Sequence, residues 1–439
     1  MKRKLVQLIK RAASNIPPAI GTRISRIPFK YRLGSSYSRY KSRAGRKIEP
    51  SEMFNRVKLL VEFAEKHIPF YQEFYRKHGF SSAQLNGFED LALIPIVTKN
   101  DLQACNFAQR VLDADRGIVT NTGGTSGKPL KLLLDDEAYA REWAHMHSIW
   151  EQLDYKTQSI KLTVRGMNLG DVPLHYNFIH NEFQVNAYCD FKRLVTELDA
   201  ILEKYKIEYL HGYPSGIYEL IKQLDEQYPE VLDKLTTNLK GVFFGSEYPA
   251  PVYRDFIEQK LHIPSLSWYG HTEMAVLAFE KNEPFVYYPY QSYGYAEAVE
   301  IDGRTHLVGT TIQNKTGPLI RYDTEDIIKP ISFNNGLLES FRVLEGRTGE
   351  FVKDLRGRKI SLTALIFGRH HKLFEFADFI QVKQDTPGKL IVYVTSKRKS
   401  LDCTKLFDAR GINMSIEFKT VNKPFKTKSG KVSLIVKNQ

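Results

Sequence analysis

The chain has few cysteines, no long apolar run and no acidic residue before position 49. Its 439 residues include three cysteines, Cys105, Cys189 and Cys403, which are far apart and form no CxxC pair. This excludes a disulfide framework and a local zinc knuckle. No apolar run approaches the roughly 20 residues that a membrane span needs, and the start lacks the apolar core of a cleavable signal peptide. We therefore expect a protein of the reducing cytoplasm.

The missing acids explain the net charge. The chain has 63 Lys and Arg against 50 Asp and Glu, which gives +13. Fourteen of these basic residues and one acid, Glu49, lie within residues 1–50, so the other 389 residues carry 49 charges of each sign. A protein that coats nucleic acid is basic over the whole binding domain. We expect no nucleic-acid partner.

The basic segment 1–47 has turn signals at Pro17-Pro18 and at Pro28. These predict a short amphipathic helix followed by an irregular arm. Two roles stay open for this arm. It could bind the anionic inner face of the cytoplasmic membrane at its periphery, or it could pack back on acidic patches of the body.

The body begins near residue 50 and alternates helical with strand-like segments, which is typical of α/β layers. Apolar residues at spacings of three and four predict a helix over 51–79 with Ser51 as its N-cap. Further helices are expected over 135–152, 191–205, 214–227 and 251–261. Runs of β-branched and aromatic residues predict strands over 161–166, 207–212, 239–246 and 265–270, and mostly strands and turns follow over 285–330.

Residues 346–360 concentrate glycine and charge, as a hinge between domains would. The remaining chain predicts a small α+β domain with strands at 389–396 and 414–420 and a helix near 401–409. We therefore expect three parts: a basic arm (1–49), a large domain (50–345), and a C-terminal lid (346–439) whose hinge lies near 347–350.

The strongest local signal is the segment TNTGGTSGKPLKLLL, residues 120–134. Its backbone N–H groups, hydroxyls and lysine can surround a phosphate. It is no Walker loop, because the GxxxxGK[ST] spacing fails and the strand-like KLLL follows where a helix should begin. Taken alone, it also fits a flexible surface turn. The candidate phosphate ligands are Thr122, Gly123, Gly124, Thr125, Ser126, Gly127 and Lys128.

Four more segments decide between these readings: GSEYPAP from Gly245, WYGHTE at 268–273, GPLIRYDTEDI at 317–327 and PFKTKSGKV at 424–432. Because these segments occur together in this order, the chain from about residue 50 to its end resembles the adenylate-forming superfamily of acyl-CoA synthetases. It is most similar to the phenylacetate–CoA ligase branch and its CapK-type proteins of capsular polysaccharide synthesis. The resemblance implies an α/β fold with a large multi-sheet adenylation domain and a small α+β lid.

The resemblance also implies a role for each matching residue. The glycine-rich loop would hold the β- and γ-phosphates of ATP, and Lys431 would be the adenylation lysine. Glu273 would help to hold Mg²⁺, and Thr272 would reach the α-phosphate. The residues implied around AMP are Gly245, Ser246, Glu247, Tyr269, Gly270, Thr272, Asp326 and Arg347, of which Asp326 and Arg347 would contact the ribose.

Three histidine regions need separate interpretations. His211 lies where this branch shapes its acyl pocket, and a plain capping role stays open. We expect His271 to pack or cap, and we expect no metal site in the cluster 175–180, which has no Cys or acid at ligand spacing. Upstream, Thr98 and Lys99 match a helix-capping segment.

The function that the resemblance implies is that of an acid–thiol ligase. With ATP and Mg²⁺ it would convert a small carboxylic acid into acyl-AMP and pass the acyl group to coenzyme A, in surface polysaccharide biosynthesis. Thr348, Gly349 and Glu350 stand where superfamily members commonly have an Asp pair at the hinge, so direct transfer to an amine, such as an amino sugar, stays open. A non-catalytic nucleotide-binding scaffold is a further alternative function. The sequence also leaves open whether the protein forms a homodimer. No residue identifies the acid.

Overall fold

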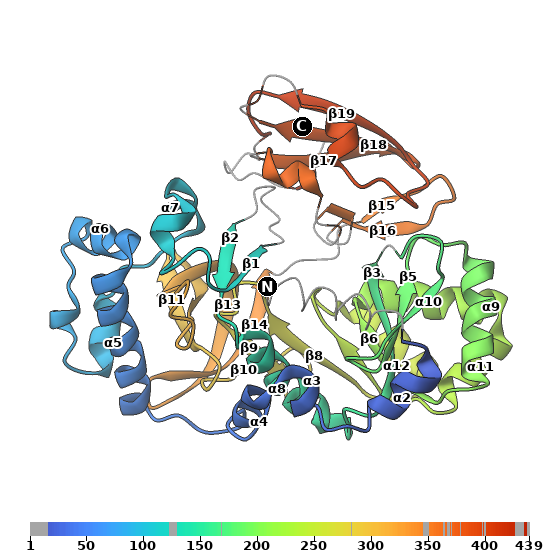
Figure 1. Ribbon diagram of the computed structural model, residues 1–439, viewed down its shortest axis with the longest axis horizontal. Helices are drawn as coiled ribbons and strands as arrows, with labels where there is room; N and C mark the ends of the chain where they lie inside the picture. Colours follow the sequence, from blue (N-terminus) through green and yellow to red (C-terminus); the bar gives the residue numbers. More distant parts are fainter. Residues whose placement is uncertain are drawn as a thin grey trace.

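A large α/β domain and a small C-terminal domain make up the molecule (Figure 1). The computed structural model describes residues 16–122, 130–167, 169–281, 283–345, 351–362, 365–366, 369, 371–377, 379–396, 398, 401–425 and 434–436. Within these residues no helix is long and apolar enough to span a bilayer.

The helices are mostly short, and several begin at a proline, which has no backbone N–H to leave unsatisfied in the first turn. Their bounds are α2 Pro18–Ile24, α3 Lys30–Leu33, α4 Ser35–Lys41, α5 Pro50–His67, α6 Pro69–Lys77, α7 Lys99–Ala104, α8 Ala138–Trp150, α9 Phe191–Leu202, α10 Pro214–Gln227, α11 Pro229–Thr236, α12 Pro251–Leu261 and α13 Cys403–Leu406.

The strands form one large sheet and three small ones. Their bounds are β1 Ile118–Asn121, β2 Lys131–Leu134, β3 Ile160–Met167, β4 Leu174–Asn177, β5 Glu182–Asn186, β6 Ile207–Gly212, β7 Gly241–Phe244, β8 Ser265–Gly270, β9 Leu277–Glu280, β10 Tyr287–Pro289, β11 Tyr295–Ile301, β12 Arg304–Thr310, β13 Tyr322–Asn334, β14 Leu337–Glu345, β15 Phe351–Lys353, β16 Lys359–Ser361, β17 Phe379–Thr386, β18 Lys389–Thr395 and β19 Ser415–Val421.

The large sheet has a parallel and an antiparallel half. Its strand order is β11-β12-β13-β14-β10-β9-β8-β7-β6-β3-β5-β4. Strands β5, β3, β6, β7 and β8 are parallel to one another, and β8 pairs antiparallel with β9. The chain leaves β3 toward β5 and returns to the other side of β3 as β6. This reversal of strand order is a topological switch point, the place where open α/β sheets bind ligands.

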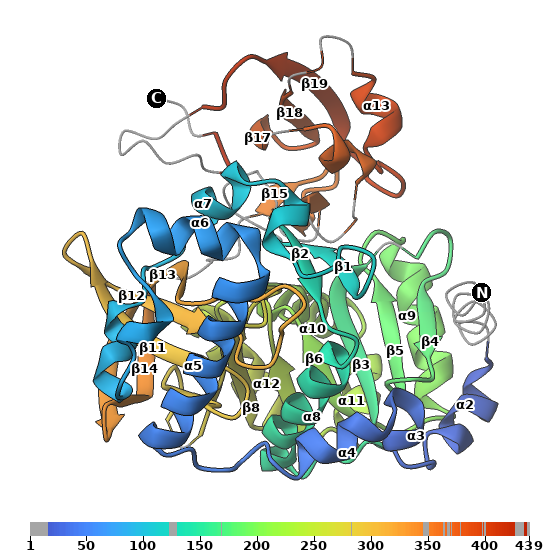
Figure 2. The same cartoon turned by 60° about the vertical axis from the view of Figure 1, so that its left-hand side comes forward.

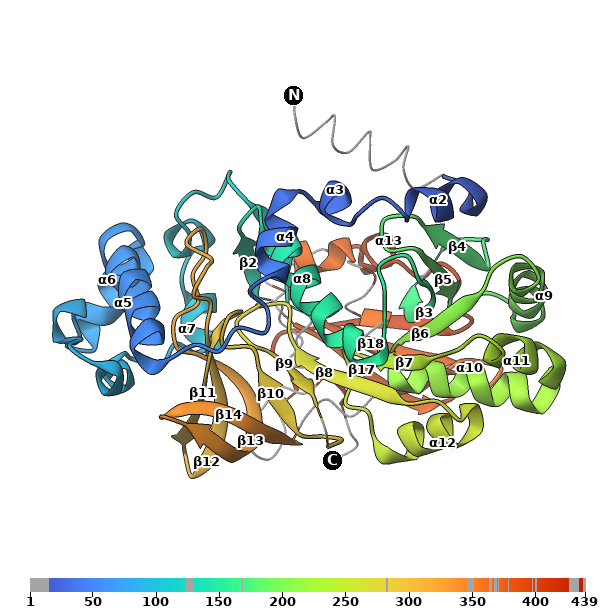
Figure 3. The ribbon, with the colours of Figure 1, turned by 90° about the horizontal axis from the view of Figure 1, so that it is seen from below.

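Helices cover both faces of the parallel half (Figure 3). On one face, residues of α9, α10, α11 and α12 pack with Leu162, Leu210 and Val242 of the strands. On the other face, Met146, Ile149 and Trp150 of α8 pack with Tyr209 and Phe243. Burial on both faces explains why β7 is apolar throughout.

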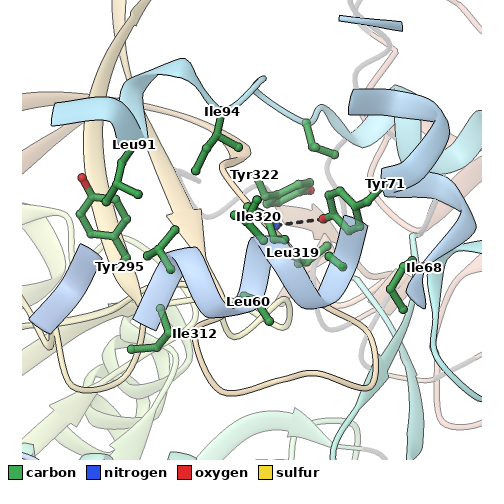
Figure 4. Packing of buried hydrophobic residues seen from close by; sticks show 14 of the residues in the cluster. Leu60, Ile68, Tyr71, Leu91, Ile94, Tyr295, Ile312, Leu319, Ile320 and Tyr322 are labelled. Carbon is green, nitrogen blue, oxygen red and sulfur yellow. Dashed lines mark hydrogen bonds between the residues drawn. The ribbon is translucent and has the colours of Figure 1, made fainter. Parts of the chain in front are cut away.

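A third core joins α5 and α6 to the antiparallel half (Figure 4). Tyr71 of α6 is buried within it. Its hydroxyl donates to the Pro318 carbonyl at 3.0 Å and accepts from the Ile320 N–H at 3.0 Å. Buried polar groups need such partners. The contact fixes the segment that leads into β13.

The predicted secondary structure is largely confirmed, with one clear correction. Helices α10 and α12 and strands β6 and β8 have the predicted bounds. The single helix expected over 51–79 was wrong, because it is divided into α5 and α6 at Ile68, which is extended before Pro69. The N-cap of α5 is Glu49 rather than Ser51, and Pro50 occupies the first helical turn.

The basic segment also differs from the expected irregular arm. Residues 16–48 form α2, α3 and α4 and pack on the body, where Phe29, Tyr37 and Tyr40 are buried against α8 (Figure 2). Arg39 pairs with Glu137, and Lys41 pairs with Glu151 at 2.6 Å. For these residues the packed alternative is the one observed, since their tyrosines and basic side chains find apolar and acidic partners on the body. Residues 1–15 lie outside the described ones.

The small domain has the expected α+β composition. Its sheet has the order β17-β18-β19, with β17 and β18 antiparallel and β18 and β19 parallel. Its core includes one residue of the large domain, Tyr188, which follows β5. The domain lies over the carboxyl ends of the parallel strands, where β16 approaches α10 (Figure 1).

Candidate functional site

Glycines stand at the carboxyl ends of three neighbouring parallel strands. Gly212 ends β6, Gly245 follows β7 and Gly270 ends β8. A Cβ on Gly245 would lie 2.2 Å from a ring carbon of Trp268, and a Cβ on Gly212 would lie 1.9 Å from the Val164 carbonyl oxygen. The neighbouring ring and backbone atoms therefore leave no room for a Cβ at Gly212 and Gly245, which explains why glycine stands at these two strand ends.

The segment that follows Gly245 is tied to helix α10. Ser246 has a positive φ of 68°, and the buried Glu247 accepts from the Ser215 hydroxyl at 2.7 Å and from its N–H at 3.4 Å. A carboxylate at the N-terminus of a helix is stabilised by the helix dipole. The three predicted residues Gly245, Ser246 and Glu247 therefore form a fixed turn at the edge of the sheet.

Tyr269 and Asp326 meet at the same edge, although they lie 57 positions apart. The Tyr269 hydroxyl donates to Asp326 Oδ2 at 2.5 Å, and the ring packs edge-on against Phe341. Burial and the adjacent Asp326 carboxylate raise the pKa of Tyr269 well above its usual range. The phenol therefore stays neutral and donates to an ionised carboxylate.

Glu273 is held from two sides. Because His271 Nε2 accepts from the Val276 N–H at 3.2 Å, its Nδ1 carries the proton that is donated to Glu273 Oε2 at 3.1 Å. The Tyr322 hydroxyl donates to Glu273 Oε1 at 3.3 Å. His271 thus positions the acid and caps the following turn, as predicted. Thr272 lies between them in the turn after β8.

Glu273 is suited to be a single carboxylate ligand of a Mg²⁺ ion. Its carboxylate is held in place by His271 and Tyr322, and carboxylate oxygens are among the ligands that Mg²⁺ prefers. Among the described residues no cluster of three or more His, Cys, Asp or Glu could hold a metal. Mg²⁺ is commonly bound by one or two carboxylates with substrate phosphates and water, and this donor set agrees with that mode.

The hairpin β1–β2 carries the glycine-rich loop. Thr122 closes it: its N–H donates to the Leu130 carbonyl and its hydroxyl accepts from the Leu130 N–H, both at 2.9 Å. The Asn314 amide donates to the Leu133 carbonyl at 2.9 Å, which joins β2 to the segment before β13. The predicted strand-like KLLL is β2. The other predicted phosphate ligands (123–128), Arg347 and Lys431 lie outside the described residues.

His211 is buried rather than open, with 1% of its surface exposed. Thr163 donates to the Glu182 carboxylate at 2.7 Å, so His211 Nδ1 is the donor in its 3.4 Å contact with the Thr163 hydroxyl. Burial, and after it the charge of Arg165, lowers the pKa of His211 well below its usual range. Its neutral ring packs against Trp150 and Trp268. The structure therefore places His211 behind Trp268, and its acyl-pocket role stays a prediction.

Sequence reasoning missed Arg165 and Glu142. Arg165 lies near the end of β3, beside the switch point, and its Nε is buried without a hydrogen-bond partner among the described residues. Glu142 of α8 accepts from the Tyr293 hydroxyl, and burial raises its pKa. The available signal was the position of Arg165 at the end of a predicted strand. The sequence contains no signal for Glu142, since it resembles any acidic residue on an amphipathic helix.

A cavity of about 130 Å³ lies between the two domains, next to this edge. Val164, Tyr213 and Ser215 line it from the large domain, and Arg358 and Ile360 line it from the small one. Ser215 also holds Glu247, so the cavity adjoins the turn after β7. A cavity of about 150 Å³ accommodates a benzene ring, so this one admits a group of similar size.

The comparisons with known proteins agree with this architecture at the level of fold. No protein-family model and no curated protein matches the chain. A 2-hydroxyisobutyryl-CoA ligase in complex with 2-HIB-AMP and CoA in the thioesterification state has a TM-score of 0.54 at 19% identity, over 88% of each chain. The same ligase in the postadenylation state with R3-HIB-AMP has a TM-score of 0.52 at 17% identity, over 88% of this chain and 89% of that one. The chain therefore shares the fold of this 2-hydroxyisobutyryl-CoA ligase, with a large α/β domain followed by a small C-terminal domain.

Proposed function

We propose that the protein is an acid–thiol ligase that uses ATP and Mg²⁺ to convert a carboxylic acid into acyl-AMP and then into a CoA thioester. The observation that carries this proposal is the gathering of Glu247, Tyr269, Glu273 and Asp326 at one sheet edge. Of the two solved structures described above, one holds R3-HIB-AMP and the other holds 2-HIB-AMP together with CoA. Resemblance in sequence names the same four residues.

In the first half-reaction the acid's carboxylate oxygen attacks the α-phosphorus of ATP, and the bond to the β-phosphate oxygen breaks to release pyrophosphate. Tyr269 and the 245–247 turn would bind the adenine, and Asp326 would accept from the ribose hydroxyls. Thr272 would donate to the α-phosphate, and Arg347 would add a ribose contact. Mg²⁺ bound by Glu273 would neutralise phosphate charge, while Lys431 would stabilise the charge that builds between the two reacting anions.

In the second half-reaction the sulfur of CoA attacks the acyl carbonyl, AMP leaves with the electron pair of the broken C–O bond, and the thiol proton passes to solvent. The cavity between the domains is lined by both of them, so movement of the small domain would change it. The finer assignment that we propose is the phenylacetate–CoA ligase branch, CapK-type, with a cytoplasmic role in surface polysaccharide synthesis. It rests on the sequence resemblance.

Acid-dependent pyrophosphate release tests the proposal. We expect release with one or more acids from a panel of aryl, short-chain and sugar-derived acids. Lys431→Ala should lower the rate by about 10²-fold or more, the usual effect of removing a transition-state charge contact. Lys428→Ala, a neighbouring lysine that we expect to be solvated, is the matched control. An unchanged rate in Lys431→Ala would remove the lysine from the mechanism.

The dependence on CoA separates the alternatives. Formation of a thioester supports the ligase, whereas acyl transfer to an amino sugar without CoA supports the amide-forming alternative that the altered hinge sequence at 348–350 keeps open. Silence across the whole panel, with ATP still bound, would support a nucleotide-binding scaffold.

A further inference from the structure

The N-terminal helices have an exposed side that takes no part in the proposed catalytic mechanism. Three apolar side chains are exposed there: Ile20 to 55%, Ile27 to 46% and Tyr31 to 71%. Arg23, Arg26 and Lys30 lie among them in the sequence and are exposed too. These six residues of α2, α3 and the turn between them are called the N-terminal face below.

The inner side of the same segment is fixed to the body. Phe29 is 3% exposed, and the Arg32 guanidinium donates to the Ile179 carbonyl at 2.7 Å and to the Ser25 carbonyl at 3.1 Å. Gly21 lies against Tyr176, where a Cβ would be 2.2 Å from the ring. The six outward residues are therefore held on a rigid support.

The basic side chains of this face have no acidic partner among the residues that the structure describes. Among the described residues none of Arg23, Arg26 and Lys30 forms an ion pair, in contrast to Arg39 and Lys41 further along. The fifteen residues that precede the described ones add five Lys and Arg, and the first acid of the sequence is Glu49. The face therefore fits an anionic partner.

The exposed apolar residues decide which anionic partner it fits. Isoleucines gain nothing from the phosphates of a nucleic acid, whereas a bilayer offers acyl chains beneath its anionic headgroups, and tyrosine favours that boundary. We propose that the N-terminal face binds the surface of an anionic membrane, with Arg23, Arg26 and Lys30 at the headgroups and Ile20, Ile27 and Tyr31 inserted between them.

The place of the face in the molecule agrees with this binding mode. Helices α2 and α3 lie at the bottom of Figures 1 and 2, and the small domain lies at the top. Arg32 contacts Thr157, which precedes β3, so the face lies near the amino ends of the parallel strands. A molecule bound by this face would turn the candidate site and the small domain away from the bilayer, where the domain is free to move.

Vesicle co-sedimentation of the full chain tests the proposal without any substrate. We expect the protein to bind vesicles of 70% phosphatidylcholine and 30% phosphatidylserine at 0.1 M salt, and not to bind pure phosphatidylcholine. In the triple variant Arg23→Gln, Arg26→Gln, Lys30→Gln the partition coefficient should fall about 100-fold, since each basic residue near such a surface contributes about fivefold. Ile20→Ser, Ile27→Ser, Tyr31→Ser should also weaken binding.

The matched control replaces three exposed basic residues of α5 and α6, Lys66, Arg76 and Lys77, with glutamine. These helices lie at the opposite end of the molecule from α2 (Figure 3). An equal loss of vesicle binding in this control would show that only the net charge of the protein matters, and it would overturn the proposal. Unchanged binding in the first triple variant would overturn it too. Binding of a DNA duplex through Arg23, Arg26 and Lys30 without vesicle binding would assign the face to nucleic acid and overturn it too.

Discussion

At the scale of single residues, the candidate site consists of carboxylates that are each held by a donor from another part of the chain. Tyr269 holds Asp326, Ser215 holds Glu247, and His271 and Tyr322 hold Glu273. The sequence named all three of these acids by resemblance. It assigned Tyr269 to stacking on adenine, and the hydrogen bond to Asp326 adds a positioning role for the predicted ribose-binding carboxylate.

Tyr269→Phe tests that role. The variant keeps the ring and removes the hydroxyl that donates to Asp326 at 2.5 Å. A hydrogen bond to a charged group contributes about 1.5–3 kcal/mol, so we expect the KM for ATP in pyrophosphate release to rise about 10- to 100-fold. Phe341→Leu, which changes a packing contact of the same ring, is the control. An unchanged KM for ATP would show that Asp326 needs no help from Tyr269.

Trp268 and Gly245 show a second kind of residue-scale constraint. Since a Cβ on Gly245 would lie 2.2 Å from the Trp268 ring, Gly245→Ala forces the ring to move from its place over His211. Overpacking of this kind destabilises proteins by about 1–3 kcal/mol. We expect a lower Tm together with weaker ATP binding, measured by calorimetry. Gly45→Ala, at a glycine with open space around it and no positive φ, controls for the general effect of losing a glycine.

At the scale of elements, the basic N-terminal segment is the part that changed most between prediction and structure. Helix α4 packs on α8, and Glu137 at the start of α8 accepts from Ser36 at 2.6 Å and Tyr40 at 2.7 Å and also pairs with Arg39. These hydrogen bonds, with Ser36 first, lower the pKa of Glu137 to about 2 from an ordinary 4.5. The contact therefore joins the segment to the body through an ionised carboxylate.

The sign of this shift predicts a pH dependence. A carboxyl group whose pKa is lower in the folded state stabilises that state fully above pH 4.5, and the contribution is lost as the pH falls toward 2. Glu137→Gln should therefore lower Tm by about 2 °C at pH 7. The difference from wild type should shrink between pH 5 and pH 3. A difference that stays constant over this range would mean that Glu137 does not anchor the segment through its charge.

At the scale of the whole molecule, the small domain contacts the segment after β5 and helix α10 of the large domain. Tyr188 belongs to the core of the small domain, and Arg358 donates to the Cys189 carbonyl at 3.1 Å. Arg356 pairs with Asp190 at 3.3 Å, and Lys359 pairs with Glu219 at 3.2 Å. The ion pairs are partly exposed and contribute little each, so Tyr188 is the main anchor.

Tyr188→Ala should loosen the docking of the two domains. Removing a buried aromatic side chain commonly costs about 3–5 kcal/mol. We expect the radius of gyration in solution scattering to increase and thermal unfolding to separate into two transitions. Tyr188→Phe is a sharp control, because the Tyr188 hydroxyl is buried without a hydrogen-bond partner among the described residues. An Ala variant as compact as wild type would contradict the anchor.

The sequence by itself indicated the α/β class and the bounds of several helices and strands, and its resemblance supplied the candidate acids, because periodicity and short motifs are local signals. It could not decide the packing of residues 16–48 or the docking by Tyr188. Each of these depends on which distant surfaces supply partners for buried side chains. Tyr269 and Asp326 meet because β8 and β13 belong to one sheet, and only the tertiary structure brings such residues within hydrogen-bonding distance.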